Sequence, residues 1–127
     1  MEARTIRYEY SESLSSVLVQ LNGSLLLSTY TTGNIVVLGT AQGKLTVTFH
    51  TFERPMGMAV RPGWLLVGTR TQVWSLRNAP NVAAEIKPRG HYDACYLPRF
   101  SHFTGNIQCH ELEADRRLKI ACCSSES

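Results

Sequence analysis

A repeat of about forty residues constrains the fold of this chain more than any other sequence feature. When the sequence is shifted by forty positions, residues 23–31 align with residues 63–71, with identical residues at five of the nine positions. Two leucine-rich strands that follow a glycine can look alike by chance. The paired threonines at 29/69 and 31/71 lie beyond the apolar run and favour a true repeat. A repeat of this length with four short strands is typical of a β-propeller blade.

Short apolar runs separated by turn residues indicate the strands. In residues 44–50, Leu45, Val47 and Phe49 alternate with polar side chains, which predicts a strand with one buried face. Spacings near ten residues with tight turns favour antiparallel sheet. The predicted strands are residues 24–30, 35–38, 44–50, 56–60, 64–69, 73–76, 94–97 and 106–112.

One short helix is expected before the first strand. Apolar residues at positions 14, 17, 18 and 21 recur with the spacing of one helix face. Ser11 or Ser13 is the expected N-cap, and the Asn-Gly pair at 22–23 is a stop signal. Residues 78–90 contain prolines and a glycine and predict a loop.

The predicted fold is all-β, a partial β-propeller of two to three antiparallel four-stranded blades with a short N-terminal helix. Residues 1–113 would hold about two blades and the first strand of a third, and residues 114–127 a polar tail, either an additional strand or a frayed end. Because a closed propeller needs about four to eight blades, we expect a truncated fragment of a larger protein. An uncovered blade face predicts self-association.

Composition excludes several classes of partner. The thirteen basic residues are scattered and the net charge is only +3, which argues against nucleic-acid binding. A long uncharged stretch, residues 13–43, is broken by turn residues and does not predict a membrane span. Without an N-terminal targeting pattern we expect a cytoplasmic protein whose four cysteines are reduced.

Several linked motifs resemble an uncharacterised bacterial family of propeller-like conserved hypothetical proteins. The motifs are residues 23–30, Glu-Arg-Pro-Met-Gly-Met-Ala-Val at 53–60, Val-Gly-Thr-Arg-Thr-Gln-Val-Trp at 67–74, Asp-Ala-Cys-Tyr-Leu-Pro-Arg at 93–99, Ser-His-Phe-Thr-Gly-Asn-Ile at 101–107, and His110. The resemblance covers roughly residues 20–112, and this chain departs from it after Glu113. It implies a fold and carries no established activity.

The residues provide little support for catalysis or metal binding. Histidines and cysteines between positions 91 and 110 are irregularly spaced, and neighbouring Cys109 and His110 would point to opposite faces of a strand. A nucleophile elbow and a glycine-rich phosphate loop are both missing. We predict no catalytic residues, no metal site and no cofactor, and we lean against an enzyme. The alternative is a propeller-type hydrolase with a channel-mouth site that uses His102 and His110.

The connections between strands point to a binding site. In a propeller, the turn between the second and third strands and the link to the next blade emerge on the same face, and loops on a rigid scaffold often bind ligands. We therefore predict a binding or scaffold module for a small anionic ligand or a protein partner. The expected ligand-binding residues are Tyr30, Arg54, Arg70, Arg99, His102 and Thr104. The competing interpretation is that the arginines are solvated surface charges.

Overall fold

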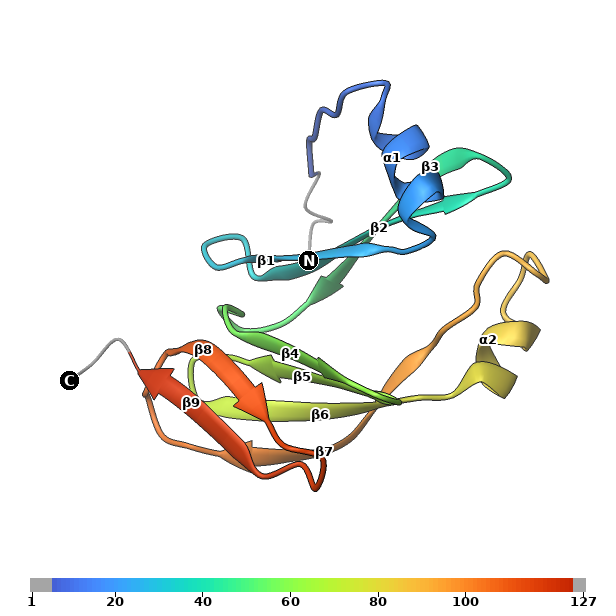
Figure 1. Ribbon diagram of the computed structural model, residues 1–127. Helices are drawn as coiled ribbons and strands as arrows, with labels where there is room; N and C mark the ends of the chain where they lie inside the picture. The colour runs from blue at the N-terminus through green and yellow to red at the C-terminus, as the bar shows by residue number, and fades with distance from the viewer. Residues whose placement is uncertain (1–5, 125–127) are drawn as a thin grey trace.

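The computed structural model describes residues 6–124 as three antiparallel sheets stacked face to face (Figure 1). The prediction of a mostly antiparallel β fold is confirmed, and the sheets do not close on one another. The first sheet has the order β1-β2-β3 and the middle sheet the order β4-β5-β6-β7; β8 and β9 form a hairpin. The strands are β1 (Leu25–Thr29), β2 (Asn34–Ala41), β3 (Lys44–Thr51), β4 (Met58–Arg61), β5 (Trp64–Gly68), β6 (Gln72–Asn78), β7 (Tyr96–Phe103), β8 (Cys109–Ala114) and β9 (Ile120–Ser124).

Helix α1 (Leu14–Leu21) forms where the helical spacing predicts it. Ser13 stands at the N-cap position, although its side chain makes no capping hydrogen bond. The helix ends at Asn22, whose φ of 50° is left-handed, a conformation that asparagine tolerates better than most residues. Helix α1 packs on β2 and β3 of the first sheet (Figure 1).

Strand β7 corrects the prediction of a short strand at residues 94–97 followed by a rim connection at 98–105. β7 runs from Tyr96 to Phe103 and pairs with β6 along its length. A bulge leaves Arg99 as the extra residue between Pro98 and Phe100, and β7 is an edge strand, where a proline costs no ladder hydrogen bond. The sequence at 98–99 therefore looked like a turn although it continues a strand.

Two further segments have more regular structure than the sequence predicts. The expected loop at residues 78–90 contains α2 (Pro80–Glu85), with Pro80 in the first turn, where proline needs no amide donor. Residues 114–127 include β9, which pairs with β8. Leu118 and Ile120 pack against buried core residues, and this apolar burial holds the hairpin in place.

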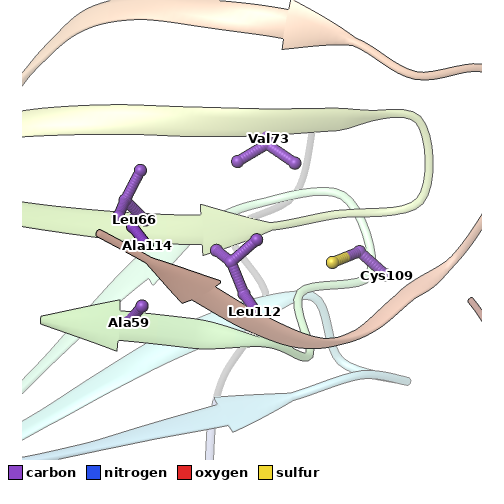
Figure 2. Close-up of a cluster of buried hydrophobic side chains, with 6 residues drawn as sticks. All are labelled: Ala59, Leu66, Val73, Cys109, Leu112 and Ala114. Atoms are coloured by element: carbon purple, nitrogen blue, oxygen red, sulfur yellow. The ribbon is translucent and has the colours of Figure 1, made fainter. Parts of the chain in front are cut away.

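Strand β5 of the middle sheet is buried on both faces. Leu65 and Val67 point toward the first sheet, where they pack with Ile35 in one core cluster. Leu66 points the opposite way and belongs to the cluster that Figure 2 shows, together with residues of β8. Burial on both faces explains why β5 reads as an unbroken apolar run rather than an alternating one.

The β8–β9 hairpin lies on the middle sheet at two glycines. A Cβ atom on Gly68 would lie 2.7 Å from Cys109 Sγ, and one on Gly57 would lie 3.0 Å from the backbone of Glu111 and Leu112. Only residues without a side chain allow β8 to approach this closely. The two glycines thereby bring Cys109, and the segment just before it, against the end of β5.

Two threonines make the same kind of hydrogen bonds across hairpin turns in the first and middle sheets. Thr29 Oγ1 donates to the Asn34 carbonyl and accepts from the Asn34 amide, across the turn between β1 and β2. Thr69 Oγ1 makes the same pair of hydrogen bonds with Gln72, across the turn between β5 and β6. The two threonines stand forty residues apart, although Thr29 bonds the residue five positions on and Thr69 the residue three positions on.

Candidate ligand-binding site

Backbone hydrogen bonds join three connections at one end of the sheets. The Arg70 amide donates to the Glu53 carbonyl at 3.2 Å, and the Gln108 amide donates to the Arg70 carbonyl at 3.1 Å. The Thr104 amide donates to the Thr71 carbonyl at 2.8 Å. The link from β3 to β4, the β5–β6 turn and the segment before β8 thus form one surface. We call this surface the rim, defined by Tyr30, Glu53, Arg54, Arg70, Thr104 and Gln108.

Arg54 is held at the rim by a chain of side-chain contacts. Its Nη1 donates to the Tyr30 hydroxyl at 3.1 Å, and its Cζ lies 5.4 Å from the centre of the Tyr30 ring. The Tyr30 hydroxyl in turn donates to Gln108 Oε1, also at 3.1 Å. Both contacts orient the exposed guanidinium while leaving most of its donors free. Among residues 6–124 no carboxylate lies within ion-pair distance of Arg54.

The positive charge of Arg70, in contrast, is paired with the carboxylate of Glu53. Its Nε lies 3.1 Å from Glu53 Oε1, an ion pair that is too poorly directed to count as a hydrogen bond. Both side chains are partly exposed, so the pair adds little to stability. Glu53 offsets much of the Arg70 charge, and the positive character of the rim therefore comes mainly from Arg54.

Two rim residues adopt unfavourable backbone conformations. Arg54 has φ 48° and Gln108 has φ 47°, both in the left-handed region that residues with a Cβ rarely occupy. Each costs on the order of 1 kcal/mol and persists only where the surroundings enforce it. The residue after Arg54, Pro55, is fully buried and anchors the backbone beside it. Holding Arg54 and Gln108 in these conformations therefore costs folding free energy.

The structure brings four of the six predicted site residues to the rim: Tyr30, Arg54, Arg70 and Thr104. Arg99 and His102 instead lie within strand β7, which corrects their expected position on a connection. Arg99 sits at the bulge, five residues before Thr104, or about 15 Å along an extended strand. His102 lies against Phe100, with ring centres 5.6 Å apart.

Gln108 is a rim residue that sequence reasoning missed. It follows the irregular residues 104–107 and carries no charge, so nothing in the sequence distinguishes it from an ordinary loop glutamine. Its role depends on Tyr30, which lies 78 residues away in the sequence. A contact of that separation is set by the stacking of the sheets.

The thiols and His110 lie at a different place, on the hairpin. A hollow of about 540 Å³ opens between residues 56–58 and the hairpin, lined among others by His110, Cys122 and Cys123. Burial, and then the neighbouring Cys122 thiol, raise the pKa of Cys109 to about 12, so this thiol is a poor nucleophile. Within residues 6–124 no three His, Cys, Asp or Glu side chains are placed to hold one metal ion.

Comparison with known proteins identifies a family whose function is not described. Residues 12–127 match the family model described as a domain of unknown function, DUF4915. The chain belongs to this family. The match continues beyond Glu113, where the sequence suggested that the family resemblance would end. No curated protein and no solved structure matches the chain. Within the described residues, no helix of this family member has the length and apolarity that crossing a membrane requires.

Proposed function

We propose that this DUF4915 domain is a non-catalytic binding module that recognises a small anionic ligand, or an anionic group on a protein partner, at the rim. The observation that carries the proposal is Arg54: an exposed guanidinium held by Tyr30, with no carboxylate within ion-pair distance among residues 6–124. Planar guanidinium groups suit carboxylate and phosphate oxygens in bidentate geometry. Tyr30 and Thr104 would add hydroxyl groups, and Arg70 a second, partly neutralised cation.

We further propose that the scaffold is part of a β-propeller made of repeated blades. Threonines forty residues apart that each bond the backbone across a hairpin turn, and three antiparallel sheets stacked face to face, support this assignment. In such a scaffold the rim corresponds to one end of the blades, where connections from successive blades meet. A cytoplasmic location and a bacterial origin belong to the same proposal, and rest on the sequence alone.

The proposal is tested with inorganic phosphate and succinate as probes, by isothermal titration of the purified chain. A charge-assisted contact is worth roughly 1.5–3 kcal/mol, so Arg54→Ala should weaken binding of the preferred anion by about tenfold or more. Tyr30→Phe should weaken it less, because the ring remains and only the orienting hydroxyl is lost. Affinity should also fall as salt is added.

Arg99→Ala is the matched control, because it removes the same charge from mid-strand, away from the rim. It should change the affinity less than twofold, as expected for a screened distant charge. Equal losses for Arg54→Ala and Arg99→Ala would show a non-specific effect of net charge. Such a result, or failure of both probes to bind at millimolar concentration, would refute the rim as an anion site.

The hydrolase alternative is less well supported. It needs His102 and His110 near one another, yet His102 lies beside Phe100 on β7 and His110 lines the hollow next to the hairpin. A catalytic pair must lie within hydrogen-bond reach of a shared substrate.

A further inference from the structure

One face of the middle sheet is only half covered. The hairpin buries Ala59, Leu66 and Val73 on this face. Because cross-strand partners share a face, Trp64 and Phe100 lie on the same side as Leu66 and Ser75. Phe100 is nevertheless 42% exposed. The apolar surface continues past the edge of the hairpin without a cover.

The uncovered part of this face is a row of side chains in contact, with rings tilted or edge-on to one another. The Trp64 and Phe100 ring centres are 5.8 Å apart, and those of Phe100 and His102 are 5.6 Å apart. The Arg77 guanidinium lies 5.3 Å from the centre of the Trp64 ring. We call Arg77, Trp64, Phe100 and His102 the aromatic face. It continues the interface that the hairpin already makes with the same sheet.

A second apolar surface lies on the opposite side of the molecule, on the first sheet. Leu26 packs into the core between the sheets, so Leu25 and Leu27 point outward, and each is 43% exposed. Helix α1 packs mainly over β2 and β3. Leu21 at the end of the helix is 71% exposed. We call Leu21, Leu25 and Leu27 the leucine face.

The leucine face adjoins an unprotected strand edge, that of β1. Within residues 6–124, β1 and β9 are edge strands with one neighbour each. Neither strand contains a charged residue or a proline, the usual protection of an exposed edge. Residues 13–43 around β1 contain no charge at all.

We infer that the leucine face of one copy of this chain packs on the aromatic face of a second copy, beside the β8–β9 hairpin. The leucine face is an uncharged, leucine-rich sheet surface with an open edge. It can therefore cover the apolar side chains of the middle sheet that the hairpin leaves exposed. Two different surfaces meet, so the contact is heterologous and repeats from copy to copy, closing into a ring or growing into a chain. This inference goes beyond ligand binding and does not depend on the rim.

Complementation between two variants tests the inference in analytical ultracentrifugation over a range of chain concentrations. The wild-type chain should gain mass as its concentration rises. Phe100→Glu and Leu27→Glu place a charge on one face each, and each should weaken self-association by roughly 30-fold or more, the scale of an interface hot spot. Mixed in equal amounts, the two variants should form a heterodimer, because one intact interface remains between them.

Val82→Glu on α2 is the matched control, since Val82 is exposed to a similar degree, 42%, and lies outside both faces. It should associate like the wild type, and circular dichroism should show that all variants remain folded. A wild-type chain that stays monomeric would overturn the inference and assign the aromatic face to another partner. A mixture of the two variants that fails to dimerise would also overturn the inference. Normal association of Leu27→Glu would overturn it too, and would indicate a symmetric contact between aromatic faces.

Discussion

Replacing Gly68 with alanine tests whether the hairpin is docked as the structure shows. The new Cβ would lie 2.7 Å from Cys109 Sγ and 2.9 Å from Cys109 Cβ. Non-bonded carbon contacts are favourable at about 3.5–4.0 Å, so β8 would have to retreat by about 1 Å. Because Cys109 is only 1% exposed and belongs to the core cluster of Figure 2, this retreat also loosens the packing around Leu112.

The expected cost follows from overpacking. Extra methylene groups in a packed core cost about 1–3 kcal/mol. With an unfolding entropy of about 2.1 cal/mol/K per residue, a chain of this length loses about 4 °C in Tm per kcal/mol, hence about 4–11 °C in all. Thermal and urea unfolding followed by circular dichroism measure the change. Gly23→Ala is the control, because its Cβ would meet nothing closer than 3.8 Å.

A double-mutant cycle separates this steric effect from other consequences of the substitution. In a Cys109→Gly background, the atom nearest to the Cβ on Gly68 would be the carbonyl oxygen of residue 109, at 3.5 Å, an ordinary contact. The cost of Gly68→Ala should therefore shrink in that background. A Gly68→Ala chain as stable as Gly23→Ala, or an equal cost in both backgrounds, would refute the close approach of β8 to β5.

Two further predictions concern single side chains. Thr69→Val should destabilise the fold by about 1–2 kcal/mol in urea unfolding, because the Gln72 amide loses its side-chain acceptor. Thr69→Ser keeps the hydroxyl and should retain most of the stability. Equal stabilities of the two variants would contradict the turn geometry. The pKa of Cys109 is raised by burial from 9.0 to about 12, so its contribution to stability should be complete below pH 9 and be lost as the pH rises toward 12. Cys109→Ala should show a flatter stability profile over that range; a profile like the wild type's would refute the assignment.

Local sequence patterns predict the elements whose apolar residues recur with regular helix or strand spacing. The 3.6-residue spacing predicts α1 with its observed bounds, and the alternation in residues 44–50 predicts most of β3. β7 was predicted too short because Pro98 and Arg99 resemble a turn in isolation. The strand continues only because β6 pairs with it across a bulge, and sequence periodicity carries no information on that pairing.

At the rim, too, the sequence predicts local features but not contacts between distant segments. Tyr30, Arg54, Arg70 and Thr104 could be predicted because strand order alone decides at which end of a sheet a connection emerges. Arg99 was misplaced together with the end of β7. The neutralisation of Arg70 by Glu53 depends on contacts between separate connections, which only the stacked sheets define.

The rim and the hairpin are mechanically linked, because the residue that orients the Arg54–Tyr30 pair immediately precedes β8. Gln108 accepts from the Tyr30 hydroxyl, and the next residue, Cys109, is the one that Gly68 allows to approach β5. Displacement of β8 would therefore move Gln108, release Tyr30 and free the Arg54 side chain. An anion bound at the rim favours the state in which all three sheets are docked, and it should stabilise the fold by RT ln(1 + [L]/Kd). Gly68→Ala should thus weaken anion binding even though position 68 contacts no rim side chain, whereas Gly23→Ala should leave binding unchanged.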